Sequence, residues 1–198
     1  MDHFHYREGQ YFAEGVPLAR IASAVGTPCY VYSRAILEQQ WRLFDDAFGD
    51  YPHRIHYAVK ANGNLAILNL LCQMGSGFDI VSGGELERVL KAGGRPDDVV
   101  FSGVGKRESE ITSALETGIH CINVESAAEL DRVDRIAGTL GVVADIALRI
   151  NPDVDPHTHP YIATGLRETK FGVPTDQVPD LVRQAHDASH VKIIGLAC

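Results

Sequence analysis

Short apolar runs alternate along the chain with longer segments in which apolar residues recur every three or four positions. The short runs are typical of buried strands, and the longer segments are typical of helices with one apolar face. We predict six main strands, which cover residues 55–61, 77–82, 99–103, 121–125, 145–151 and 192–198. The first four begin at residues 55, 77, 99 and 121, a constant step of 22 residues by subtraction. This alternation predicts an α/β protein with a parallel sheet covered by helices.

Polar residues that favour helix N-termini precede the helical segments: Ser33, Asn64, Ser82, Ser126 and Thr175. Ser82 and Ser126 are each followed three positions later by a glutamate, in the S-x-x-E pattern of a capping box. The helix after Ser33 is expected to bury one apolar face, formed by Ile36, Leu37, Trp41, Phe44 and Phe48. A further strand is predicted at residues 30–32, just before this helix.

The regular strand–helix unit favours a (β/α)8-type barrel over an open doubly wound sheet. An open sheet reverses its strand order, and no G-x-G-x-x-G fingerprint follows the first strand here. The chain has about six β/α units, so we expect an incomplete barrel in residues 35–198, preceded by a separate segment, residues 1–34. Its last strand would expose an unpaired edge, through which we expect association. Residues 152–172 are predicted to form a long polar loop.

Composition narrows the classes of partner. The 198 residues are 45% hydrophobic and 22% charged, which is typical of soluble globular proteins. The net charge of −8, without a cluster of Lys and Arg, argues against a nucleic-acid or membrane partner. No apolar run is long enough to span a membrane, and the first residues lack the features of a secretory signal. The four cysteines are far apart and form no C-x-x-C pair, so we expect reduced thiols in a cytoplasmic protein.

Reactive side chains in a barrel gather where strands run into the loops that follow them. The residues at these positions are Lys60, Asn62, Asp79, Ser102, Asn123, Glu125, Arg149 and Asn151. Lys60 ends an apolar run, and burial there would favour the neutral, nucleophilic amine that holds an aldehyde cofactor as a Schiff base. Asp79, one strand over, is the expected ion-pair partner of Lys60. Arg149 either faces a cofactor or carboxylate, or forms a salt bridge beneath a loop.

Two weaker motifs point to other chemistry. Residues 103–106 (GVGK) resemble part of a phosphate-binding loop, but Val100 and Arg107 stand where a Walker A motif needs glycine and Ser/Thr. His157 and His159 lie in a segment with metal-binding side chains, yet the other strand ends offer no matching set of ligands. We therefore expect no metal site.

Several motifs together resemble a known family. Residues 57–62 (YAVKAN) resemble the cofactor-lysine motif of the fold-type III pyridoxal-phosphate decarboxylases. Further matching segments follow at the spacing of that family: residues 77–86, 149–154, 159–165 and 169–172. The combination is similar to the diaminopimelate decarboxylases and extends from about Gly26 onward. The resemblance implies a barrel of the alanine racemase kind that binds pyridoxal 5'-phosphate, with residues 1–34 belonging to a second, β-rich domain.

The resemblance also implies site residues and an activity. Lys60 would hold pyridoxal 5'-phosphate covalently, Asp79 and Glu85 would lie near it, and Arg149 would lie close to the cofactor ring. The implied reaction is decarboxylation of meso-2,6-diaminopimelate to L-lysine and CO₂, the last step of lysine biosynthesis, by a homodimer with active sites at its interface. Further binding residues of the family would follow Cys198, so we expect little activity from these 198 residues alone.

Two other functions stay open at this point. A non-catalytic barrel paralogue would use the same strand ends as a binding or regulatory surface. A metal-dependent barrel hydrolase would use His157 and His159, although the missing ligand set makes it the weaker alternative.

Overall fold

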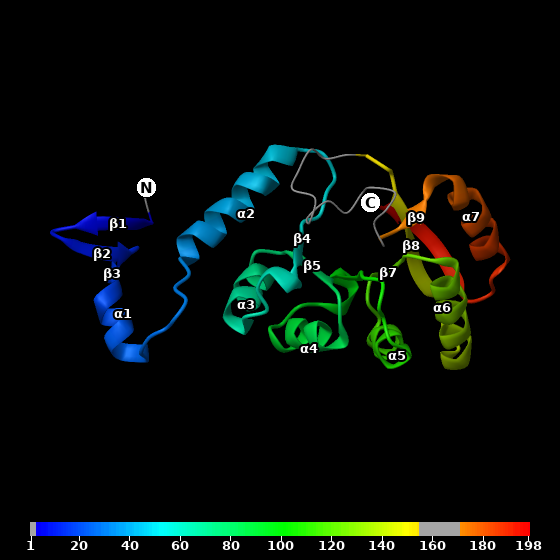
Figure 1. Cartoon of the computed structure of the whole chain (residues 1–198), viewed down its shortest axis with the longest axis horizontal. Coiled ribbons are helices and arrows are strands. Elements are labelled where there is room, and N and C mark those ends of the chain that lie inside the picture. The colour runs from blue at the N-terminus through cyan, green and yellow to red at the C-terminus, as the bar shows by residue number, and fades with distance from the viewer. Residues whose placement is uncertain (1–2, 155–170) are drawn as a thin grey trace. The chain divides into compact units, whose positions relative to one another are not determined.

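The computed structural model describes residues 3–154 and 171–198, and the chain divides into two compact units, Met1–His53 and Arg54–Cys198 (Figure 1). Each unit is described by itself. The division that we expect after residue 34 stays a prediction.

The first unit contains an antiparallel sheet and two helices: β1 (Phe4–Arg7), β2 (Gln10–Ala13), β3 (Val16–Pro17), α1 (Leu18–Val25) and α2 (Arg34–Phe48). Glu8 and Gly9 join β1 to β2 and both have positive φ angles, 51° and 74°. This pair forms the two-residue loop that suits the twist of a hairpin. The prediction of a strand at residues 30–32 is wrong, because that segment is not part of either sheet. Tyr30 within it is 90% exposed.

Ser33 begins α2 as predicted. Its hydroxyl oxygen accepts from the Ile36 N–H at 3.1 Å, and the hydroxyl itself donates to Glu14 Oε1 at 2.7 Å. Glu14 Oε1 also accepts from the Ala35 N–H at 3.0 Å, which joins the loop after β2 to the first turn of α2.

Acidification is expected to weaken this junction. The Ala35 N–H and then the Ser33 hydroxyl lower the pKa of Glu14 below its usual 4.5, because both hydrogen bonds favour the carboxylate. When folding lowers the pKa of a carboxyl group, that group stabilises the folded state fully at pH values above its pKa in the unfolded chain. The contribution is lost as the pH falls through its pKa in the folded state. The Ala35 amide shift, followed by NMR, should therefore change in the acidic range below 4.5. Glu14→Gln should remove this transition, and an unchanging Ala35 signal in the unmodified chain would contradict the expectation.

The apolar face predicted for α2 is not buried. None of its residues is buried in the described structure, and Phe44 and Phe48 are 57% and 41% exposed. The two rings contact each other edge to face, with centroids 5.4 Å apart. The prediction is wrong on this point because apolar periodicity identifies a face of a helix without identifying what covers it.

The second unit is a parallel sheet with helices between successive strands. Its elements are β4 (His56–Ala58), η1 (Val59–Ala61), α3 (Leu65–Gln73), β5 (Gly77–Ile80), α4 (Gly83–Lys91), η2 (Pro96–Asp98), β6 (Val99–Phe101), α5 (Glu108–Thr117), β7 (Cys121–Val124), α6 (Ala127–Leu140), β8 (Ala144–Asn151), β9 (Val173–Pro174), η3 (Thr175–Gln177), α7 (Val178–Asp187) and β10 (Val191–Ala197). The strands run side by side in chain order, from β4 through β8 to β10. This order confirms the predicted α/β fold of an incomplete (β/α) barrel.

The strands of this sheet alternate between two kinds of side chain. Phe78, Ile80, Phe101 and Ile122 are fully buried, and helices α3 to α6 lie along one side of the sheet (Figure 1). The residues between them, including Asp79 and the neighbours of Ile122, therefore face the other side. The sheet thus buries one apolar face beneath helices and presents polar groups on the opposite face.

Three predictions for this unit need correction or stay open. The first strand ends at Ala58 rather than at residue 61, because the backbone turns into the 3₁₀ helix η1. In β10, the apolar side chains of Ile194 and Leu196 are exposed, and association through this last strand stays a prediction. Most of the predicted polar loop, residues 155–170, lies outside the described residues. No described helix is long and apolar enough to cross a membrane.

Candidate active site

A cleft of about 330 Å³ lies where the strands of the second unit end. Its lining includes His56, Lys60, Asp79, Ser102, Asn123 and Arg149. Five of these six were predicted from the strand ends, and the structure brings them to one cavity. The other predicted positions, Asn62, Glu125 and Asn151, do not line this cleft. We call this cavity the strand-end cleft.

Lys60 is the middle residue of η1, two positions beyond the end of β4, and its side chain is exposed. The expectation that burial makes it nucleophilic is therefore wrong for the described structure. The cause is the 3₁₀ turn, which carries the residue out of the sheet. Its amine forms no hydrogen bond or ion pair with the described residues, so the expected ion pair with Asp79 is not formed. The amine is instead accessible at the mouth of a cavity that it shares with Asp79 and Arg149.

Asp79 is held by a series of hydrogen bonds across three adjacent strands. The Ser102 hydroxyl donates to Asp79 Oδ1 at 2.5 Å. The Asn123 side-chain Nδ2 donates to Ser102 Oγ at 2.9 Å. The Cys121 thiol lies 3.9 Å from Asn123 Oδ1, and burial, followed by the charges of Asp145 and Asp79, raises the pKa of this thiol to about 11. A thiol with that pKa stays protonated near neutral pH, so Cys121 is no nucleophile there.

Arg149 forms a salt bridge, which was one of its two expected roles. Its Nη1 donates to Glu125 Oε1 at 3.0 Å, and its guanidinium lies 5.0 Å from the centroid of the Phe171 ring. Glu125 is 2% exposed at its side chain and also accepts from the backbone N–H of Gly103 at 2.7 Å. Arg149 has further donors, because only one of its five N–H groups is used in this pair, and it lines the cleft.

The sequence analysis missed a second buried ion pair beside this one. Lys106 has a fully buried side chain, and its ammonium donates to Glu129 Oε1 at 2.9 Å and to the carbonyl oxygens of Gly103 and Asn123, both at 2.7 Å. Glu129 Oε2 accepts from the Glu125 N–H at 2.7 Å. The only sequence signals were the GVGK segment, set aside as a failed phosphate loop, and the capping glutamate. The two ion pairs together link the loop after β6, the junction of β7 and α6, and strand β8.

Glu85 does not reach Lys60 in the described structure. Its Oε2 accepts from the Val81 N–H at 2.7 Å, while its own N–H donates to the capping Ser82 Oγ at 3.3 Å. Glu129 and Ser126 form the same arrangement at the start of α6, which confirms both predicted caps. The carboxylate of Glu85 is thus committed to the junction of β5 and α4.

His56 is a cleft residue that the sequence analysis also missed. Burial lowers its pKa, so that its imidazole stays neutral near pH 7, and its Nδ1 has no hydrogen-bond partner within the described chain. Its position early in a short strand carries no recognisable motif.

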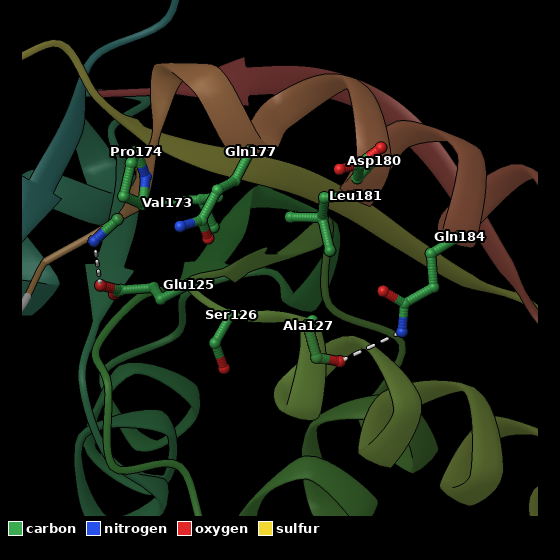
Figure 2. A pocket seen from close by; sticks show the side chains of 10 residues that line it. Glu125, Ser126, Ala127, Val173, Pro174, Gln177, Asp180, Leu181 and Gln184 are labelled. Carbon is green, nitrogen blue, oxygen red and sulfur yellow. Dashed lines mark hydrogen bonds between the residues drawn. The ribbon is translucent and has the colours of Figure 1, made fainter.

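A larger groove of about 440 Å³ lies between the start of α6 and α7 (Figure 2). Glu125 and Ser126 line it from one side, and Leu181 and Gln184 from α7, whose Gln184 amide donates to the Ala127 carbonyl at 3.5 Å. The described residues that line it include no lysine or arginine. The strand-end cleft is the candidate active site, because it combines an accessible amine, a carboxylate and a guanidinium.

Metal ligation finds no support in the part of the chain that the structure describes, since its residues contain no group of three or more His, Cys, Asp or Glu that could hold an ion. His157 and His159 lie outside the described residues.

Comparison with known sequences gives a consistent result. A model of the pyridoxal binding domain of pyridoxal-dependent decarboxylases matches residues 34–198. The diaminopimelate decarboxylase of Vibrio cholerae is 59% identical over 100% of this chain and 48% of its own length. That of Pseudomonas aeruginosa is 56% identical over the same shares. The chain therefore spans about half the length of these relatives.

Solved structures agree with the sequence matches. Diaminopimelate decarboxylase from M. jannaschii in complex with L-lysine has a TM-score of 0.91 at 34% identity, over 98% of this chain and 47% of that chain. The Helicobacter pylori enzyme complexed with L-lysine has a TM-score of 0.87 at 42% identity, over 90% of this chain and 45% of that one.

Proposed function

The chain belongs to the pyridoxal-dependent decarboxylases, and on this basis we propose that the strand-end cleft binds pyridoxal 5'-phosphate, with Lys60 as its covalent anchor. The single observation that carries the proposal is the accessible Lys60 amine at a cavity shared with Asp79 and Arg149. The cleft volume, about 330 Å³, lies within the usual range of small-molecule sites.

The residues of the cleft fit the chemistry of this cofactor. When bound, pyridoxal phosphate supplies an electron sink for the charge left on the α-carbon after CO₂ departs. The Lys60 amine can attack an aldehyde in its neutral form and carries no competing hydrogen bond within the described chain. Arg149, with donors left beyond its pair with Glu125, can bind an anionic or ring acceptor. Asp79 offers a carboxylate to a cationic nitrogen near Lys60.

For the reaction, we propose decarboxylation of meso-2,6-diaminopimelate to L-lysine and CO₂ by the protein that contains this chain. Relatives named diaminopimelate decarboxylase at 50–59% identity support this substrate, as do the L-lysine complexes of two solved neighbours. A homodimer in the cytoplasm, and a role for residues 1–34 in a second, β-rich domain, are parts of the same proposal.

Reductive trapping tests the proposal directly. The 198-residue chain is incubated with pyridoxal phosphate, reduced with borohydride, digested and mapped by mass spectrometry. We expect the label on the peptide that contains Lys60, at cofactor concentrations that leave Lys91 and Lys192 unlabelled. Lys91 and Lys192 are exposed lysines outside the cleft, so they report the non-specific reaction of the aldehyde.

Equal labelling of Lys60, Lys91 and Lys192 would refute a built cofactor site. Selective labelling without decarboxylation by a full-length protein would favour the non-catalytic paralogue. Zinc bound in place of any label would favour the hydrolase.

A further inference from the structure

Asp79 shows an asymmetry that its proposed role does not explain. One carboxylate oxygen, Oδ1, accepts from the Ser102 hydroxyl at 2.5 Å, whereas Oδ2 has no hydrogen bond with the described residues. Lys60, on the same cleft, has no partner there either. The carboxylate is therefore tied on one side and available on the other.

The direction of the hydrogen bonds follows from the donors. Asn123 Nδ2 carries only N–H groups, so Ser102 Oγ must accept from it at 2.9 Å. The one hydroxyl proton of Ser102 is then left for Asp79, which accepts it. Because each member has one role in the series, Asn123 fixes the orientation of Ser102, and Ser102 fixes that of Asp79.

The position of these groups argues against a purely structural role. A barrel interior is ordinarily filled by bulky apolar side chains, and residues of β5 to β7 on the helix side, such as Phe78 and Ile122, are fully buried. Ser102, Asn123 and Asp79 face the other side and line the cleft. Three polar groups at successive strand ends, joined in series by hydrogen bonds that end at one oxygen of Asp79, are typical of residues that orient a reactive group.

We propose that Ser102 and Asn123 are positioning residues, which hold Asp79 so that its free oxygen receives a cationic nitrogen at Lys60. This inference rests on the proposed cofactor site and adds the residues that orient its acid. Ser102 and Asn123 act through Asp79 and need not touch the ligand.

Two replacements of Asn123 distinguish a positioning role from simple space filling. Asn123→Asp keeps the size of the side chain but removes its N–H donors, so the Ser102 proton is drawn to position 123 and away from Asp79. Asn123→Leu removes the donors without adding a charge. If Asn123 only filled space, the near-isosteric Asn123→Asp change would be the milder of the two. The proposal predicts that it is at least as harmful.

The experiment measures the concentration of pyridoxal phosphate that gives half-maximal borohydride trapping at Lys60. We expect Ser102→Ala and Asn123→Asp each to raise it about 10-fold to 100-fold, the loss expected for one hydrogen bond to a charged group. In an Asp79→Ala background, the same two changes should each have less than about a 2-fold further effect. Far-UV circular dichroism and urea unfolding of every variant identify any general loss of structure.

The outcomes separate this inference from the proposed function. If the unmodified chain traps cofactor at Lys60 but the variants match it, the positioning role is overturned and the cofactor site stands. Equal effects with and without Asp79 would also overturn it, since they would reflect general destabilisation. Failure of the unmodified chain to trap cofactor at Lys60 would overturn both.

Discussion

Replacing Lys60 by alanine is expected to lower kcat/KM for decarboxylation by about 1,000-fold or more, the largest effect of any single change in the cleft. Lys60 is the only lysine among the described residues that line the cleft, its amine can hold an aldehyde as a Schiff base, and it has no other partner in the described chain. The measurement needs a full-length protein, so residues 1–198 replace the matching part of the Vibrio cholerae relative, to which they are 59% identical, and are joined to the rest of that protein. Release of CO₂ from meso-2,6-diaminopimelate reports the rate.

Two control variants test whether the loss of activity comes from loss of the covalent anchor. Lys60→Arg keeps the positive charge but cannot form the covalent link, so it should lose as much activity as Lys60→Ala. Lys91→Ala removes an exposed lysine outside the cleft and should leave the rate unchanged. If Lys60→Ala retained a tenth of the activity or more, Lys60 would not be the anchor.

The sequence predicted the sheet because the pattern of apolar runs reflects burial on its helix side. Each of the six predicted strands overlaps an observed one, and the caps at Ser82 and Ser126 form as expected. Local hydrogen bonds of this kind join residues three or four positions apart, so a sequence pattern contains them fully.

The missed features depend on contacts that no local pattern contains. The 3₁₀ turn at Lys60 has the same apolar composition as a continuing strand, so only the structure distinguishes the two. The apolar face of α2 was correctly identified as a face, but its burial depends on a partner surface. The pair of Lys106 and Glu129 joins residues 23 positions apart, and it forms because the parallel pairing of β6 and β7 brings the loop after β6 close to the first turn of α6.

Lys106→Met is expected to destabilise the second unit by about 3–5 kcal/mol, the usual result of removing one partner of a buried ion pair. Lys106 has 0% and Glu129 7% of the side chain exposed, so the remaining carboxylate would be left with little access to water. The carbonyl oxygens of Gly103 and Asn123 would also lose their donor. Urea unfolding followed by far-UV circular dichroism measures the change. Tryptophan fluorescence would not report on the second unit, because Trp41, the single tryptophan, lies in the first unit.

A double-mutant cycle separates loss of the pair from loss of packing. Glu129→Gln in the Lys106→Met background removes the uncompensated charge while keeping an acceptor for the Glu125 N–H, so part of the stability should return. Lys91→Met, at an exposed position, should change the free energy of unfolding by no more than about 0.5 kcal/mol. A loss below about 1 kcal/mol for Lys106→Met would contradict the expectation for a buried pair.

We also expect Lys106→Met to weaken cofactor binding in the strand-end cleft. Lys106 holds the carbonyl of Gly103, whose N–H donates to Glu125, and Glu125 in turn pairs with Arg149. Gly103 has a φ of 105°, a conformation that glycine adopts readily and other residues do not, and its two hydrogen bonds fix this turn between Lys106 and Glu125. Loss of Lys106 therefore releases the support of Arg149, and cofactor affinity should fall together with stability. Replacing a whole buried ion pair by apolar residues is often neutral for stability, so we expect the benefit of this network to lie in fixing one arrangement of the residues around the site.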